Sequence, residues 1–246
     1  MMTSYKPNSF RTTANPLLKF YNPTEVYSAL TSNKNILGWL DFVANHYLPE
    51  PRKVLLLYPC STVKPYHVSR SYKILFSTLS QLGEKRKNVH LVTISEPFGL
   101  VPEEFYGVKT EWHDWEKDWY DCPGLFRWWC SKHGQPYCRQ HLDASIEILA
   151  SNIASFLKRV KTKRIYSQII AFVRTYSSNL SKKDDHTHRR IIERASQLSN
   201  VKVKLLPTKS QINQIVSKRG RLAWDLYGVA HPYAQSKLLT YLRRIL

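Results

Sequence analysis

The chain has 246 residues, of which 43% are hydrophobic, a proportion typical of folded rather than disordered proteins. Its net charge of +19 is uneven: residues 1–150 carry 17 Lys and Arg against 14 Asp and Glu, whereas residues 151–246 carry 20 against 4. No run of about 18 uncharged apolar residues is present, which argues against a membrane-spanning helix. The basic half favours a surface that docks a polyanion; the alternatives are a solvated basic face or a membrane surface.

Two further features bear on the compartment. Residues 1–22 contain scattered polar residues and no apolar segment of the kind that a signal peptide requires. Four Cys in a chain of this size do not resemble a secreted disulfide framework. We therefore expect a cytoplasmic protein.

The hydrophobic pattern predicts the following elements in chain order. After an irregular start, helices are predicted over 23–30 and 35–47, the second ended by two prolines. An unbroken apolar run predicts a buried strand over 54–58, followed by a polar loop over 60–71. A helix over 72–82, a strand over 89–95 and a loop over 96–102 come next. We then expect a helix over 141–160, a strand over 164–173, a helix over 184–198 capped by Asp184 or Asp185, a strand over 201–206 and a helix over 232–246.

This alternation predicts an α/β fold, with a mostly parallel sheet flanked by helices. Residues 1–50 are expected to form an N-terminal helical extension that packs on the core, and residues 51–246 an α/β domain with a basic C-terminal half. Sites in open α/β sheets lie beyond the carboxyl ends of strands. We therefore expect the loop that begins at Cys60 and the loop over 96–102 to lie side by side.

Three short motifs resemble the signature of the archaeosine synthase family. The string Pro59-Cys60-Ser61-Thr62-Val63-Lys64-Pro65-Tyr66, with Ser69 and Ser71, matches the pattern P-C-x3-K-P-Y-x2-S-x-S-H. The second and third motifs are Gly99-Leu100-Val101-Pro102 and Tyr120-Asp121-Cys122-Pro123, which match G-L-V-P and Y-D-x-P. One position departs, because Tyr72 stands where the family has His.

The resemblance implies a uracil-DNA-glycosylase-like fold and attack on the nitrile of 7-cyano-7-deazaguanine in tRNA, with lysine as the amine donor. No cofactor is required. Full-length members also carry a transglycosylase-like domain and a small RNA-binding domain, which are absent from these residues. The tRNA would then be held by the basic half, or by a partner such as a separate transglycosylase-like or radical-type subunit.

Cys60, Lys64 and Asp121 are the predicted catalytic residues. A thiolate adds to a nitrile to give a thioimidate, nearby cations lower a thiol pKa, and a carboxylate can orient an amine or take its proton. The alternatives are that Cys60 is a buried packing residue and that Lys64 holds a phosphate or the donor's carboxylate. The predicted substrate-binding residues are Ser61, Tyr66, Ser69, Ser71, Tyr72, Gly99 and Pro102. The two tyrosines are equally compatible with the core, the two later serines with helix caps, and Gly99 and Pro102 with shaping the loop.

A second constellation has the spacing Cys-x2-His-x4-Cys-x2-His: Cys130, His133, Cys138 and His141. Four such side chains can hold a structural zinc ion in a tetrahedral site. The alternative is an aromatic-rich loop that leads into a helix.

Ten basic residues are predicted to contact RNA phosphates: Lys158, Arg159, Lys161, Lys163, Arg164, Arg189, Arg190, Lys218, Arg219 and Arg221. Two main hypotheses follow. The intact Pro59-Cys60 pair favours an enzyme that modifies tRNA, whereas Tyr72 favours a non-catalytic or partner-dependent tRNA-binding subunit. A third hypothesis, base excision or transfer, rests on fold analogy alone.

Overall fold

The computed structural model describes residues 15–122, 124–174, 187–220, 224 and 227–246. Five strands form one sheet in the order β3-β2-β1-β4-β5. Their bounds are β1 Arg52–Pro59, β2 Val89–Ser95, β3 Gly99–Pro102, β4 Tyr166–Phe172 and β5 Lys204–Leu206. All neighbours pair in parallel except β3, which is antiparallel to β2. The prediction of a mostly parallel sheet flanked by helices is therefore confirmed.

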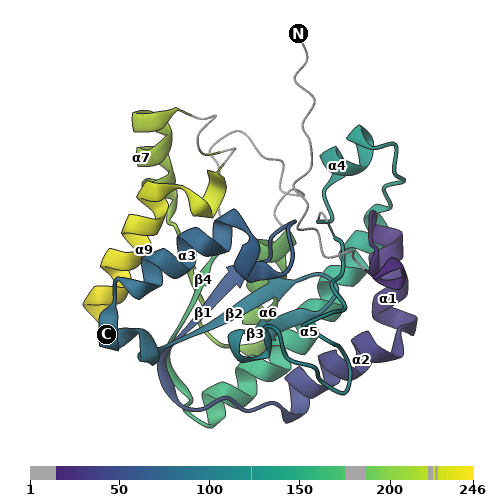
Figure 1. The fold of residues 1–246 in the computed structure, drawn as a ribbon, viewed down its shortest axis with the longest axis horizontal. Helices are drawn as coiled ribbons and strands as arrows, with labels where there is room; N and C mark the ends of the chain where they lie inside the picture. Colours follow the sequence, from purple (N-terminus) through teal and green to yellow (C-terminus); the bar gives the residue numbers. More distant parts are fainter. Residues whose placement is uncertain (1–14, 123, 175–186, 221–223, 225–226) are drawn as a thin grey trace.

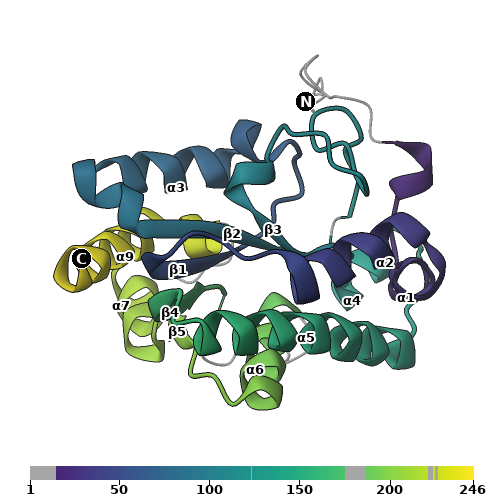
Figure 2. The same ribbon diagram turned by 90° about the horizontal axis from the view of Figure 1, so that it is seen from below.

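Helices cover both faces of the sheet (Figures 1 and 2). On one face lies α3 (Arg70–Ser80), which links β1 to β2, and on the other lie α5 (Arg139–Thr162) and α6 (Thr187–Ser199). Helix α9 (Pro232–Ile245) contacts α3 and α7 (Lys209–Arg219). Helices α1 (Pro23–Ser32) and α2 (Lys34–Asp41) contact each other, α1 packs on α5, and a π-helical turn, Phe42–His46, continues α2. The short helix α4 (Arg127–Lys132) precedes α5.

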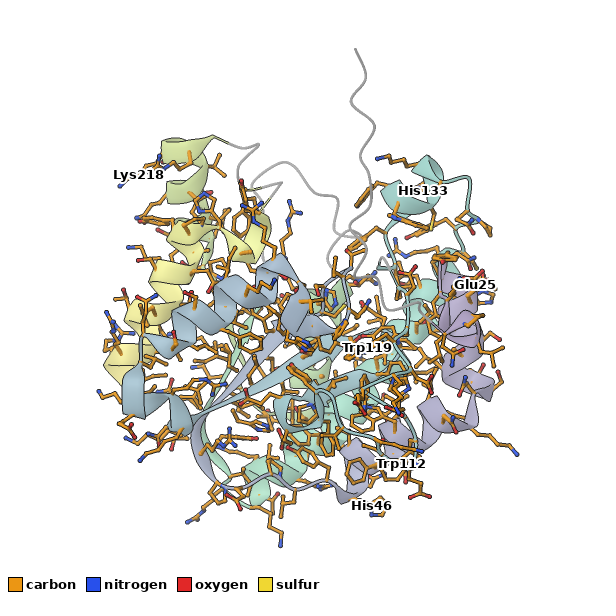
Figure 3. All side chains as sticks on the ribbon, viewed as in Figure 1. Glu25, His46, Trp112, Trp119, His133 and Lys218 are labelled. Carbon is orange, nitrogen blue, oxygen red and sulfur yellow. The ribbon has the colours of Figure 1, made fainter. Side chains whose placement is uncertain are left out.

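The centre of the core is the run of leucines in β1. Leu55, Leu56 and Leu57 are fully buried, because β1 has a strand on each side and helices above and below. Side chains fill the space between the sheet and the helices (Figure 3). Truncation of one of these leucines to alanine would cost about 2–5 kcal/mol. The continuous apolar pattern is thus explained by a central strand.

Residues before position 50 share this hydrophobic core. The indole Nε1 of Trp39, a fully buried residue of α2, donates to the carbonyl oxygens of Phe98 and Leu100, both at 3.1 Å. Gly99 has a φ of +66°, and a Cβ atom there would lie 2.9 Å from Leu40 Cδ2. Glycine is therefore required where α2 packs over the start of β3.

Some elements differ from those predicted. Residues 99–102, predicted as a loop, form β3. This strand has four residues, begins with Gly and ends with Pro, so its sequence does not resemble a typical strand. The helices α4 and α7 were not predicted, and β5 is shorter than expected. The predicted caps Asp184 and Asp185 lie outside the described residues. Among the described residues, no helix combines the length and the apolar character needed to traverse a bilayer.

Candidate active site

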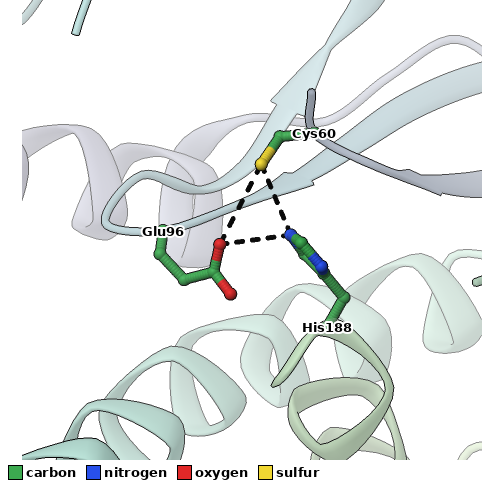
Figure 4. A group of neighbouring side chains, drawn as sticks. All are labelled: Cys60, Glu96 and His188. Carbon is green, nitrogen blue, oxygen red and sulfur yellow. Dashed lines mark hydrogen bonds and ion pairs between the residues drawn. The ribbon is translucent and has the colours of Figure 1, made fainter. Parts of the chain in front are cut away.

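Three reactive side chains meet at the carboxyl edge of the sheet (Figure 4). Cys60 follows β1, Glu96 follows β2, and His188 is the second residue of α6. The backbone N–H of Cys60 donates to Ile94 O in β2 at 2.8 Å, and the Cys60 sulfur lies 4.0 Å from Glu96 Oε2, so the starts of the two predicted loops lie side by side. The strand order reverses direction at β1, and such a switch point is where open α/β sheets place their ligands.

The three functional groups are in contact. The His188 Nε2 atom lies 3.1 Å from Glu96 Oε2 and 3.4 Å from Cys60 Sγ, and the sulfur lies 4.0 Å from the same carboxylate oxygen. The other oxygen, Glu96 Oε1, accepts a hydrogen bond of 2.8 Å from the Thr187 hydroxyl. Glu96 is fully buried, whereas Cys60 and His188 are both half-buried. The sulfur and the imidazole are therefore the partly accessible members of the cluster.

Glu96 and His188 form a buried ion pair. Burial opposes the charge on Glu96, but the adjacent imidazole and Thr187 outweigh it, and the pKa of the carboxyl lies below its ordinary value. Burial likewise opposes protonation of His188, but Glu96 and Cys60 outweigh it, and the pKa of this histidine lies well above its usual value. An imidazolium 3.4 Å from Cys60 Sγ stabilises a thiolate and can deliver a proton.

Lys64, a predicted catalytic residue, is buried beside this cluster and has partners of its own. Its Nζ atom donates to Cys122 O at 3.2 Å and lies 4.3 Å from the centroid of the Tyr120 ring. Burial raises the pKa of the Cys122 thiol, as do Glu96 and Cys60, whereas Lys64 acts in the opposite direction. Lys64 therefore fixes the segment that follows Tyr120, and Cys122 remains a protonated thiol.

Tyr66 and Tyr72, predicted to contact substrate, are fully buried. The Tyr66 hydroxyl pairs with that of Tyr120, and the Tyr72 hydroxyl donates to Pro59 O at 3.3 Å and pairs with Thr93. Both rings thus support the end of β1 from within the core, which is the alternative that the sequence left open.

The remaining predicted residues of this region have contacts outside the cluster. Ser69 caps α3 by accepting from Tyr72 N at 3.3 Å, with the Ser71 hydroxyl 3.3 Å away. The Ser61 hydroxyl donates to Val63 O at 2.6 Å. Gly99 and Pro102 are the two ends of β3. Asp121 accepts from the Tyr21 hydroxyl at 3.2 Å, and its backbone pairs with the N-terminal segment around Leu18 and Phe20. Of the three predicted catalytic residues, Cys60 is thus the member of the cluster.

The four predicted zinc ligands do not converge. His133 Nδ1 lies 2.9 Å from Trp129 O, and His141 Nδ1 lies 2.9 Å from the Thr24 hydroxyl, while its ring stacks on Tyr27. Cys130 Sγ faces Tyr21 O at 3.8 Å, and Cys138 is the N-cap of α5. Among the residues that the structure describes, Cys60, Glu96 and His188 form the only group of three or more such ligands. The structure therefore does not bring together the zinc site predicted over 130–141.

The predicted phosphate contacts fall into separate groups. Lys158, Lys161, Lys163 and Arg164 are exposed at the end of α5, where Ile165 O accepts from Arg52 N at the start of β1. They therefore lie at the amino edge of the sheet, away from Cys60. Lys218 and Arg219 are exposed at the end of α7, and Lys218 lies at the upper left of the molecule in Figure 3. Arg221 lies outside the described residues.

Three of these arginines have structural partners. Arg159 donates to Ala44 O at 2.9 Å and to Tyr47 O. Arg189 pairs with Glu193 at 2.7 Å, and Arg190 pairs with Asp143 at 2.6 Å. These three side chains are engaged in contacts within the protein, so the exposed lysines are the stronger candidates for contacts with a polyanion.

Glu96 and His188 were not predicted as site residues. Glu96 directly follows the end of a predicted strand, and the carboxyl-end rule offers a signal that could have found it. His188 gives no such signal, because it stands beside Arg189 and Arg190 and reads as part of a basic surface.

Comparison with known proteins supports the resemblance of the motifs. Residues 36–121 match a family described as a domain of unknown function, DUF5591. An archaeosine synthase subunit alpha from Methanosarcina acetivorans is 30% identical over 125 residues, which cover 47% of this chain and 19% of that protein. The protein of the same description from Thermococcus kodakarensis is 39% identical over 70 residues, which cover 27% and 12%.

Among solved structures, the crystal structure of AF0587, a protein of unknown function, aligns with 83% of this chain and 49% of that chain at 16% identity and a TM-score of 0.44. Residues 36–121, which match the DUF5591 family, include Cys60, Lys64, Glu96 and Asp121. The alignments span less than a fifth of the curated relatives. Part of this chain, centred on residues 36–121, is therefore similar to the DUF5591 family and to a part of archaeosine synthase alpha subunits.

Proposed function

We propose that this chain acts in archaeosine modification of tRNA, by adding lysine to the nitrile of 7-cyano-7-deazaguanine with Cys60 as the nucleophile. The observation that carries the proposal is the contact of 3.4 Å between Cys60 Sγ and the His188 imidazole at the switch point of the sheet. The similarity to archaeosine synthase alpha subunits supports the choice of substrate. The uracil-DNA-glycosylase-like fold belongs to the same proposal.

In the first step, the Cys60 thiolate attacks the nitrile carbon, a C–S bond forms, and the nitrile nitrogen takes a proton from His188. The product is a thioimidate. In the second step, the lysine amine attacks the same carbon, His188 takes a proton from the amine, and the C–S bond breaks to return the thiolate. The substituted amidine that leaves contains all the atoms of the nitrile and the amine, and the enzyme is regenerated.

The surroundings of the thiol support this chemistry. Glu96 keeps His188 charged, so that a proton is available at the nitrile nitrogen. The exposed lysines of α5 and the end of α7 would hold tRNA phosphates, and a separate subunit would complete the binding of tRNA. Asp121 would orient the amine from the neighbouring segment.

A second candidate function is a tRNA-binding subunit without catalysis of its own. One observation favours it: Tyr72, which stands where the family signature has His, is fully buried and bonded to Pro59 and Thr93. A role that the histidine fills in relatives is not filled by this side chain.

One assay separates the two functions. We would incubate tRNA that carries the nitrile base with labelled lysine and with wild type, Cys60→Ala or Cys138→Ala. The enzyme hypothesis predicts transfer by wild type and by Cys138→Ala, and a loss of about 10³-fold or more in Cys60→Ala. Mass spectrometry of the acid-quenched reaction should also find the base attached to Cys60. Binding of tRNA with neither transfer nor adduct would support the non-catalytic subunit.

A further inference from the structure

The cluster that holds the reactive thiol also has the composition of a metal site. It offers one sulfur, one imidazole nitrogen and one carboxylate oxygen, all within 4.8 Å of one another. Thiolate and imidazole ligands favour Zn²⁺ and similar cations over Mg²⁺ and Ca²⁺, which prefer oxygen. The chemistry of the donors therefore selects a thiophilic divalent cation.

The distances between the donors fit a tetrahedral ion. Usual Zn–S, Zn–N and Zn–O bond lengths place the sulfur about 3.5 Å from each of the other two donors, and those two about 3.3 Å from each other. The observed distances are 3.4 Å from Cys60 Sγ to His188 Nε2, 4.0 Å from the sulfur to Glu96 Oε2 and 3.1 Å from Oε2 to Nε2. A movement of about 0.5 Å by the half-buried Cys60 side chain would complete the geometry.

The carboxylate is oriented for this role. The Thr187 hydroxyl holds Glu96 Oε1 at 2.8 Å, so that Oε2 is the oxygen that faces both the imidazole and the sulfur. Hydrogen bonds of this kind fix the direction of ligands in known metal sites. Glu96 is fully buried, so it has no competing position in solvent.

We infer that Cys60 Sγ, Glu96 Oε2 and His188 Nε2 bind one Zn²⁺ ion, and that this binding withdraws the thiol from covalent chemistry. The ion displaces the protons of the thiol and of Nε2, so metal and proton compete for the same atoms. Three protein ligands leave a fourth position for water. The inference goes beyond the proposed function and does not depend on it, because it rests on the geometry of the three donors.

Cobalt provides a direct test, because Co²⁺ bound to a thiolate gives a charge-transfer absorption band. We would titrate the metal-free full chain with Co²⁺ and expect the band to saturate at one equivalent and to disappear when Zn²⁺ is added. Cys60→Ser should abolish the band, and His188→Gln should weaken binding by about tenfold or more. The matched controls Cys130→Ser and His141→Gln should bind as wild type does. Absence of a band, or its survival in Cys60→Ser, would overturn the inference.

Alkylation gives a second, independent measurement. Iodoacetamide labelling of Cys60, followed by peptide mass spectrometry, should slow by about tenfold or more with stoichiometric Zn²⁺ and not with Mg²⁺. Equal labelling with and without Zn²⁺ would contradict the inference. Circular dichroism of each variant separates lost binding from lost folding. Lysine transfer by a chain that binds no Co²⁺ would refute this inference alone, and Co²⁺ binding by a chain that transfers no lysine would refute the proposed function alone.

Discussion

Two regions of this molecule contain similar side chains and differ in what the fold does with them. In residues 130–141, two Cys and two His stand close together in sequence, yet Cys130, His133 and His141 contact different neighbours and Cys138 is the N-cap residue of α5. Cys60, Glu96 and His188 are far apart in sequence and touch. The difference arises because Cys60 and Glu96 follow the adjacent parallel strands β1 and β2, and His188 lies in the first turn of α6, the helix after β4. The 130–141 segment instead runs from the end of α4 through a turn to the start of α5. Convergence at a sheet edge is thus stronger evidence of a site than spacing along the chain.

The largest effect is expected from Glu96→Gln. Removal of the buried carboxylate leaves His188 without its counter-charge, and we expect the free energy of unfolding to fall by about 3–5 kcal/mol. In the control, Glu147→Gln, an exposed pair with Arg194 is lost, at a cost below about 1 kcal/mol. Urea denaturation measures both. Equal costs would show that Glu96 is not charged in the folded protein.

The second comparison concerns the reactivity of the thiol. His188→Ala removes the cation beside Cys60 and should slow alkylation of that sulfur by about 100-fold at neutral pH. His133→Ala, in the 130–141 segment, should leave the rate unchanged. Alkylation quenched at a series of times, followed by peptide mass spectrometry, gives the alkylation rate of each Cys. A rate in His188→Ala that matches wild type would mean that the imidazole does not activate Cys60.

His113 is also buried, but unlike His188 it forms no ion pair with a carboxylate in the described structure. Burial lowers the pKa of His113 to about 4, although Asp118 and Asp114 act in the opposite direction. Because the unfolded chain takes up this proton near pH 6.5, the contribution to stability is complete above pH 6.5 and is lost as the pH falls toward 4. Relative to His113→Gln, wild type should lose roughly 2 kcal/mol between pH 7 and pH 5. Parallel unfolding curves across this range would show that His113 titrates normally.

The smallest effect is expected at a surface residue that precedes the 130–141 region. Trp128 in α4 is 54% exposed and stacks on Phe126 at 5.9 Å, so its ring is available to a nucleobase. If the chain binds tRNA as proposed, Trp128→Ala should weaken affinity by about tenfold, and Leu17→Ala, at an 84% exposed site, should not. Filter binding at fixed salt measures both variants. Unchanged affinity would place the RNA elsewhere.

The sequence predicts the central fold well and the site in part. The predicted strands over 54–58 and 89–95 correspond to β1 and β2. The unbroken apolar run of the first is typical of a strand buried on both faces. The proximity of the loops that begin at Cys60 and Glu96 was predicted because both follow the carboxyl ends of parallel strands. Strand β3 could not be predicted, because pairing with β2 and contact with α2 decide its conformation. The role of His188 could not be predicted either, because its contact with Cys60 spans 128 positions and exists only in the folded chain.

The placement of His188 on α6 has a consequence for the design of shorter proteins. The family match ends at residue 121, so a fragment cut at that boundary would retain the sulfur and the carboxylate but lose the imidazole. It would also lose β4, the strand that flanks β1 on its other side. The region that matches the family therefore contains two of the three side chains of the cluster, and a fragment that keeps all three has to extend into α6.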